Sequence, residues 1–159
     1  MDFNLSPKTT EYAAKLQAFM DSEVFPAEAV YHQQREQLIA QGKPHALPAI
    51  VEELKTKAKA LGLWNLFLPH YGHGLSVTDY ATLAEITGWS PEIAPEAINC
   101  AAPDTGNMEL LDMFGNKEQK ERWLQPLLDG QIRSAFAMTE PAVASSDARN
   151  IQTQIVKDG

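Results

Sequence analysis

The sequence predicts a mainly α-helical fold followed by the first strands of a β domain. Two Ser-Pro pairs, Ser6-Pro7 and Ser90-Pro91, each place a capping hydroxyl before a proline at the first helical position, and apolar residues at helical spacing follow them. The pattern changes after Gly130. Residues 132 to 138 form a short apolar run, and residues 151 to 156 alternate in the manner of a half-buried strand.

The first helix is expected to begin at Pro7 and to bury one face, formed by Tyr12, Leu16, Phe19 and Met20. We expect it to stop near Val24, because Pro26 disfavours helical geometry in the residue before it. Residues 27 to 41 then favour a polar helix at the surface.

Pro48 begins a better amphipathic helix that Gly62 ends. Its predicted apolar face comprises Ile50, Leu54, Ala58 and Leu61. Its charged residues indicate a solvated face and are Glu52, Glu53, Lys55, Lys57 and Lys59. Residues 63 to 68 are a compact apolar run that we expect to be buried.

Three further helices are predicted before Gly130. Ser76 and Asp79 form a capping pair for a helix that Gly88 ends. The helix after Pro91 carries small apolar residues as far as Ala101, and Pro103 and Gly106 interrupt it before Met108 to Phe114 resume the pattern. Asn116 and Gln119 cap the last helix, and Pro126 should kink or tighten its final turn. The tryptophans Trp64, Trp89 and Trp123 are expected to be core or half-buried anchors.

Composition excludes several classes of protein. The chain has 159 residues, a formal charge of −8 and a pI near 4.9, which argues against nucleic-acid binding. It contains neither an apolar run of membrane-spanning length nor a secretory signal, so a cytoplasmic protein is expected. The single cysteine, Cys100, lies in an alanine-rich context typical of a buried, inert thiol. His70 and His73 stand in a glycine-rich turn without further ligands nearby, so we assign no metal site.

The stretch from Ile132 to Thr153 is the candidate ligand-binding region. Its Thr-Glu-Pro turn opens into small residues, and Thr139, Ser145 and Ser146 offer hydroxyls beside peptide N–H groups. Such a loop can hold an oxygen-rich ligand, although a polar surface turn between strands has the same composition. The chain ends on Asp158-Gly159, a strong hairpin-turn signal, which predicts a fragment cut inside a β domain.

Four segments carry a resemblance to a known family. FAMTEPAVASSDARNIQT resembles the Thr-Glu-Pro-Gly-Ala-Gly-Ser-Asp motif of the acyl-CoA dehydrogenases, flavoenzymes that introduce a double bond into acyl-CoA thioesters. LGLWNLFLPHYGHG, APEAINCAAPDTGNMELL and FGNKEQKERWLQPLLDG resemble other segments of that family, in the family's order, so that most of residues 60 to 155 are covered. The Ala-Ser-Ser-Asp variant is similar to a subgroup that includes family members ten and eleven.

The resemblance implies a helical N-terminal domain over residues 1 to 131 and the truncated start of the middle β-barrel domain over residues 132 to 159. It implies FAD as cofactor, with Phe136, Met138 and Thr139 against the isoalloxazine ring and Thr139 hydrogen-bonded to its pyrimidine edge. Ser145 and Ser146 would face the FAD pyrophosphate and the pantetheine arm of the substrate. Ser146 is favoured as the substrate contact because it precedes Asp147, but an extra residue after Pro141 leaves the register open.

The implied reaction removes an α-proton with a carboxylate base while the β-hydride passes to the flavin. The family's base is a glutamate of a C-terminal domain that these residues do not include, so no catalytic residue is assigned and Glu140 is interpreted as part of the turn. The acyl tail would run along residues 91 to 114, where small side chains leave a slot or simply pack closely. The implied partners are acyl-CoA, an electron-transfer acceptor and further copies of the full-length protein.

Two other functions stay open at this point. The chain could be an independent helical interaction module, with the polar helix of residues 27 to 41 as its functional surface. It could also belong to a related flavin-dependent acyl-CoA oxidase, which residues 1 to 159 do not distinguish from a dehydrogenase. In either flavoenzyme, we expect this chain alone to be inactive.

Overall fold

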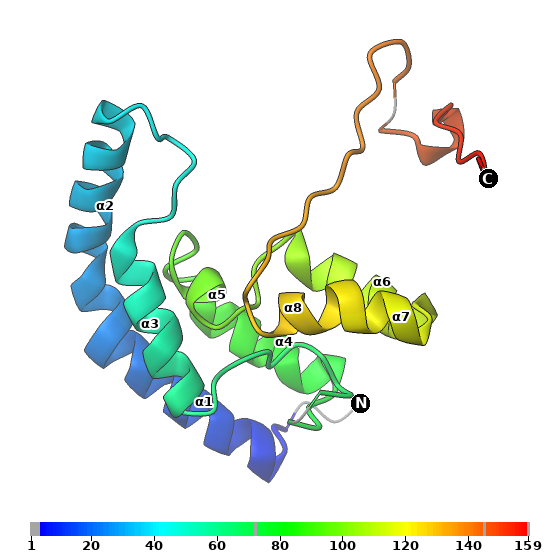
Figure 1. Cartoon of the computed structure of the whole chain (residues 1–159). Coiled ribbons are helices and arrows are strands. Elements are labelled where there is room, and N and C mark those ends of the chain that lie inside the picture. Colours follow the sequence, from blue (N-terminus) through cyan, green and yellow to red (C-terminus); the bar gives the residue numbers. More distant parts are fainter. Residues whose placement is uncertain (1–3, 72, 145, 159) are drawn as a thin grey trace.

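The computed structural model describes residues 4–71, 73–144 and 146–158, and it is helical as far as Leu128 (Figure 1). This confirms the predicted mainly helical fold. The elements in order are α1 (Pro7–Phe19), the π-helical turn η1 (Met20–Val24), α2 (Phe25–Ala40), α3 (Ala49–Ala60), α4 (Val77–Thr87), α5 (Ala94–Ala97), α6 (Asp104–Phe114), α7 (Lys117–Gln119), the π-helical turn η2 (Lys120–Leu124), α8 (Gln125–Leu128) and the 3₁₀ turn η3 (Ala148–Asn150).

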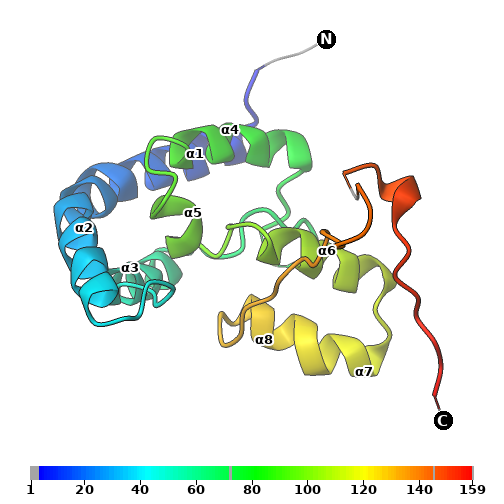
Figure 2. The same ribbon diagram turned by 90° about the horizontal axis from the view of Figure 1, so that it is seen from above.

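The helices pack in pairs around one core. Helix α1 lies against α4, α2 against α3, and α3 against α5, whereas α6 packs against η2 and α8 (Figure 2). The predicted face of the first helix is confirmed, since Leu16, Phe19 and Met20 are fully buried. The apolar run after Gly62 is buried as predicted, with Leu63, Leu66, Phe67 and Leu68 in the core.

The expected end of the first helix at Val24 is wrong. The chain stays helical from Pro7 to Ala40, because η1 inserts one wide turn in which the Phe25 N–H donates to the Met20 carbonyl, five residues back. A wider turn relieves the crowding that the Pro26 ring causes in a regular α-helix. Pro126 follows a second π-helical turn, η2, in the same way, and the chain stays helical as far as Leu128. The predicted kink or tightening of the final turn stays a prediction.

Three of the predicted caps are confirmed by their hydrogen bonds, whereas the predicted cap at Ser90 is wrong, because α5 begins at Ala94 with Ile93 as its N-cap. Ser6 accepts from the Thr9 N–H at the start of α1, and Ser76 with Asp79 forms a reciprocal capping box at α4. Asn116 and Gln119 form a second capping box before α7. These caps are local pairs three residues apart, which is why the sequence alone identifies them.

Other details of the helices differ from prediction. The helix after Pro91 is reduced to the single turn α5, and α6 begins already at Asp104. On α3, Leu54 and Ala58 are buried as predicted, but Leu61 is 51% exposed. Val51 and Lys55 complete the buried face, and Lys55 is only 7% exposed. Trp64 is half-buried as predicted, but Trp89 is 77% exposed and is no core anchor.

The predicted strands of a β domain are not seen in the described residues, so that part of the predicted fold class is wrong. Residues 132–138 and 151–156 are irregular and run outward from the helices (Figure 1). A strand needs a partner to pair its N–H and C=O groups and a core for its apolar face, and Ile155 is fully exposed. The predicted hairpin turn includes Gly159, which lies outside the described residues. No helix in the described ranges has the length and apolar character needed to cross a membrane.

Candidate functional site

An apolar groove of about 360 Å³ lies where α6, η2 and α8 meet the chain that leaves the helices. Helix α6 forms one wall and the segment after Gln131 forms another. The residues that line it are Asn107, Leu110, Leu111, Trp123, Leu127, Ile132, Arg133, Ser134 and Ala135. Its walls are mostly aliphatic and aromatic, with a few polar groups at one end, a composition typical of sites for elongated apolar ligands.

The groove continues into an exposed apolar surface. Leu110, Met113 and Phe114 of α6 are 58%, 70% and 73% exposed, so α6 carries large side chains that the described residues leave uncovered. Of the two alternatives for residues 91 to 114, close packing holds at Ile98 and Cys100, since both residues belong to the core. The open space lies instead further along the predicted region, beside Asn107 to Leu111.

The predicted ligand-binding residues begin one position after this groove. Ala135 lines it, and the next residue, Phe136, is 67% exposed; Met138 is 46% exposed. Thr139 and Ser146 are exposed as well. Ser145 lies outside the described residues. The surface therefore presents two apolar side chains and two hydroxyls on the segment that leaves the groove.

Glu140 is held by the chain that follows it. Its carboxylate accepts the backbone N–H groups of Gln152, at 3.0 Å, and Thr153, at 2.8 Å, and it also accepts the Thr153 hydroxyl. The Thr153 hydroxyl and the Gln152 N–H lower the pKa of Glu140. A carboxylate kept ionised by these donors is a weak proton acceptor, and in this structure it ties the turn to residues 152 and 153.

A cluster of charged residues holds the start of this segment. Arg133 bridges two carboxylates, with its Nε 2.6 Å from Asp104 and its Nη1 in contact with Glu96. Glu96 also pairs with Lys55, at 2.8 Å. Asp104 further accepts the Ser134 N–H at 2.7 Å and the Ser134 hydroxyl at 2.6 Å. Partial burial lowers the pKa of Arg133, but Glu96 and Asp104 together raise it above its ordinary value.

The sequence reading missed this cluster. It assigned Lys55 to a solvated face, although Val51, Leu54, Lys55 and Ala58 have the spacing of one buried stripe. A lysine on such a stripe indicates a buried partner, because an unpaired ammonium is costly to bury. No comparable local signal identifies Arg133 and Asp104, which are distant in the sequence.

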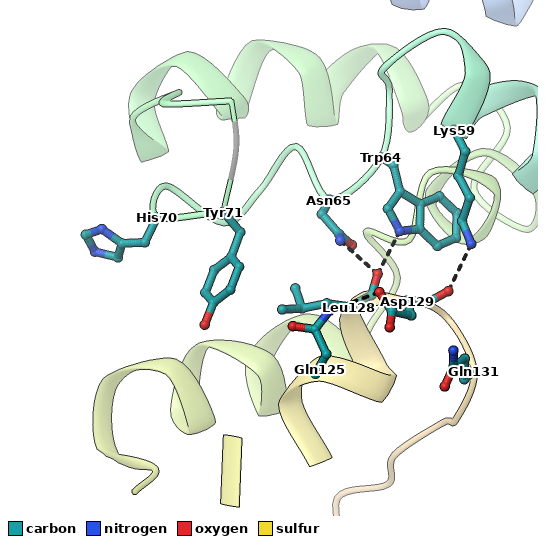
Figure 3. A pocket seen from close by; sticks show the side chains of 9 residues that line it. All are labelled: Lys59, Trp64, Asn65, His70, Tyr71, Gln125, Leu128, Asp129 and Gln131. Atoms are coloured by element: carbon teal, nitrogen blue, oxygen red, sulfur yellow. Dashed lines mark hydrogen bonds between the residues drawn. The ribbon is translucent and has the colours of Figure 1, made fainter. Parts of the chain in front are cut away.

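A cavity of about 730 Å³ lies between the chain after α3 and the end of α8 (Figure 3). Its walls are joined by hydrogen bonds. The Leu128 carbonyl accepts Trp64 Nε1 at 2.7 Å and Asn65 Nδ2 at 2.9 Å, and Lys59 Nζ donates to the Asp129 carbonyl at 2.9 Å while lying 4.1 Å from the Trp64 ring centre. These contacts attach the end of α8 to α3 and to the chain that follows it, so we assign the residues around this cavity a structural role.

The side chains of His73 and Cys100 have structural surroundings. His73 contacts the Trp64 carbonyl through Nε2, at 2.7 Å, and the Tyr12 hydroxyl through Nδ1, at 2.9 Å. Within the described residues, no cluster of three His, Cys, Asp or Glu side chains is arranged to hold a metal ion. Cys100 is buried as predicted, and burial raises the pKa of its thiol to about 11. A thiol with such a pKa is protonated at neutral pH and reacts slowly.

The family model described as "Acyl-CoA dehydrogenase, N-terminal domain" matches residues 6–131, the part of the chain that contains helices α1 to α8. The chain belongs to the acyl-CoA dehydrogenase family, as its sequence motifs predicted. A solved structure, "Structure of a putative acyl-CoA dehydrogenase from Mycobacterium abscessus", superposes on 92% of this chain with a TM-score of 0.83 and 48% identity.

Curated relatives support the same family and the predicted subgroup. "Probable acyl-CoA dehydrogenase FadE2" of Mycobacterium tuberculosis is 62% identical over the full length of this chain. "Acyl-CoA dehydrogenase family member 11" of Homo sapiens is 48% identical over 95% of it. The chain spans 38% of the first relative, 19% of the second and 37% of the solved chain, so it corresponds to one part of longer proteins.

Proposed function

We propose that this chain is the N-terminal part of an FAD-dependent acyl-CoA dehydrogenase and supplies part of its flavin and acyl-CoA site. In this proposal, residues 1 to 131 form the helical domain and residues 132 to 159 begin the next domain. The observation that carries it is the position of the apolar groove, which ends at Ala135, directly before Phe136, Met138 and Thr139.

The groove is proposed to hold the acyl tail of the substrate. Leu110, Leu111 and Leu127 give it an apolar wall, and burying methylene groups against such a wall is favourable by about 0.8 kcal/mol for each group. The groove is open, and the exposed side chains of α6 extend the apolar surface beyond it. A tail lying there would bring its thioester end toward the segment that follows Ala135.

The exposed residues after the groove fit the chemistry of a flavin. An isoalloxazine ring has apolar faces and a polar edge, and Phe136 and Met138 offer exposed apolar surface next to the Thr139 hydroxyl. Ser146 offers a second hydroxyl, which we assign to the pantetheine arm. Ser145 is then assigned to the FAD pyrophosphate, and the register between the two serines stays open. When bound, FAD supplies the acceptor for the hydride that leaves the β-carbon.

The residues of this chain would bind and orient the reactants, and we assign none of them as the base. Asp104 and Glu96 are paired with Arg133, and Glu140 accepts N–H groups from residues 152 and 153. The oxygens of these carboxylates are thus already engaged by donors of this chain. The base is proposed to lie in the part of the relatives' length that this chain does not span. The electron acceptor, the homo-oligomer and a cytoplasmic location belong to the same proposal.

The test is to express the longest natural protein that contains this sequence and to record its visible spectrum with and without acyl-CoA. A yellow protein that acyl-CoA bleaches supports the proposal. Thr139→Val should weaken FAD binding and Ser146→Ala should raise the Km for acyl-CoA, whereas the exposed control Thr78→Val should change neither. A colourless preparation that neither retains added FAD nor reduces it would favour a helical interaction module.

A further inference from the structure

The segment that leads to the proposed flavin residues is attached to the helices by one network, which we call the Arg133 latch. Its members come from three helices and from the segment itself, and they are Lys55 of α3, Glu96 of α5, Asp104 of α6, and Arg133 with Ser134. Asn107 of α6 adds a hydrogen bond from its Nδ2 to the Ser134 hydroxyl, at 2.8 Å. The network therefore connects α3, α5 and α6 to two consecutive residues.

The members behind Arg133 are largely withdrawn from water. The side chains of Lys55, Glu96 and Asp104 are 9%, 13% and 5% exposed, while that of Arg133 is 49% exposed. Two cations thus face two buried carboxylates, and Glu52 supplies a further exposed carboxylate to Lys55, at 3.0 Å. The Lys55–Glu96 pair is therefore largely withdrawn from water, whereas Arg133 contacts Glu96 and Asp104 from a half-exposed position.

The contacts of the Arg133 guanidinium fix the orientation of this side chain as well as its position. One nitrogen contacts Asp104 and another contacts Glu96, and these carboxylates come from different helices. Because the guanidinium is planar and rigid, two such contacts leave it little freedom to rotate. A lysine at this position would supply the charge but not the fork.

The latch lies between the two halves of the proposed site. Arg133, Ser134 and Asn107 also line the apolar groove, so the network forms the polar end of the groove. Thr139 follows Ser134 by five residues, a distance of at most about 17 Å in an extended chain at roughly 3.3 Å per residue. Any shift of residues 133 and 134 would therefore be passed on directly to the residues that follow them.

We infer that Arg133 and Asp104 are positioning residues that set the flavin-contacting segment in register with the acyl groove. The inference rests on the proposed function and adds residues to it that the motif resemblance does not include. Neither residue is assigned contact with the reacting atoms. They act through Ser134 and the backbone that continues to Phe136 and Thr139.

The test uses the longest natural protein containing this sequence, purified with FAD, and compares Arg133→Gln, Arg133→Lys and Asp104→Asn with the parent. Misplacement by about 1 Å costs up to roughly a hundredfold in rate, so we expect Arg133→Gln to slow flavin reduction by acyl-CoA at least about tenfold. FAD content and Tm should change far less. Arg133→Lys should recover part of the rate, and the exposed control Arg35→Gln should match the parent.

A second measurement does not depend on flavin chemistry. The Ser134 amide donates to Asp104, so Asp104→Asn should accelerate hydrogen exchange at that amide while the core of α3 stays protected. The inferred positioning role would be refuted if the Ser134 amide of Asp104→Asn exchanged as slowly as in the parent and Arg133→Gln kept the parent rate of flavin reduction. A parent protein that acyl-CoA does not reduce would overturn the proposed function instead, whereas accelerated exchange in Asp104→Asn would still support the attachment itself.

Discussion

Replacing Gly130 by alanine should destabilise the chain more than the same change at Gly62, although the two glycines occupy the same structural position. Each follows a helix end with φ at +71°. Each also has the same pair of closing hydrogen bonds: Gly62 and Leu63 donate to Lys59 and Ala58, and Gly130 and Gln131 donate to Leu127 and Pro126. This arrangement is a Schellman motif in both places.

The difference between them is the Trp64 ring. A Cβ at Gly130 would lie 2.9 Å from Trp64 Cζ2, whereas a Cβ at Gly62 has nothing within 4 Å. A left-handed non-glycine residue costs about 1–2 kcal/mol, which applies at both positions. Overpacking against a fixed ring adds about 1–3 kcal/mol at Gly130 alone. The ring cannot move cheaply, because its Nε1 donates to the Leu128 carbonyl at 2.7 Å.

The assay is thermal and urea unfolding followed by circular dichroism at neutral pH. For a chain of this size each kcal/mol corresponds to about 2–4 °C in Tm, so the extra cost at Gly130 should be resolved easily. In a Trp64→Leu background, Gly130→Ala should cost no more than Gly62→Ala, since the clashing atoms are gone. Equal destabilisation by both alanines in the parent sequence would refute the ring-contact reasoning.

Three further predictions concern side chains with defined environments. The hydroxyls of Ser76 and Thr9 lower the pKa of Asp79 in the folded chain. The stability that the ionised carboxylate contributes is therefore present above the unfolded pKa of about 3.8 and is lost as the pH falls below it. In urea unfolding, the difference in unfolding free energy between the parent and Asp79→Asn should shrink below pH 4. Cys100 should react with a thiol reagent at pH 8 at least about a hundredfold more slowly in the folded protein than in urea, because its thiol is buried with a pKa of about 11; equal rates would show that the site opens readily. Trp89→Ala should change the free energy of unfolding by less than about 0.5 kcal/mol, whereas Trp64→Ala should cost at least about 2 kcal/mol.

The sequence predicted the features that depend on neighbours along the chain. The capping boxes at Ser76 and Asn116 and the glycine stops at Gly62 and Gly130 each require only a few adjacent residues, and all four are present. The family motif is also a local signal, and it identified the family correctly. The roles of Phe136, Met138, Thr139, Ser145 and Ser146 stay predictions.

The prolines show where local rules were insufficient. Pro26 was expected to end a helix and Pro126 to kink or tighten a final turn; both follow a π-helical turn within a continuous helix. The helix continues because its buried side chains, Met20 and Val24 before Pro26 and Leu124 before Pro126, keep their places in the core. Packing against other helices therefore outweighs the tendency of a single proline to interrupt a helix. The local sequence does not show how strong that packing is.

The charged latch was missed for a different reason. Lys55, Glu96, Asp104 and Arg133 are each unremarkable in their local sequence, and only the packing of α3, α5 and α6 brings them together. Long-range pairs of this kind have no periodic signature. The burial of Lys55 is the nearest local signal, since a charged residue on a core stripe requires a partner.

The sequence after Ser146 has a strand-like pattern but forms no strand in the described residues. Its alternation is typical of a strand with one buried face, but Ile155 is fully exposed and Val156 is 76% exposed. Phe114 and Met113 of α6 are exposed in the same way. This chain spans 38% of the relative from Mycobacterium tuberculosis, which is therefore a longer protein. Hydrogen exchange at residues 154–156 tests for strand pairing, because ladder hydrogen bonds in a longer natural protein would protect these amides. The amides of Gln152 and Thr153 are less informative, since they already donate to Glu140 in this chain.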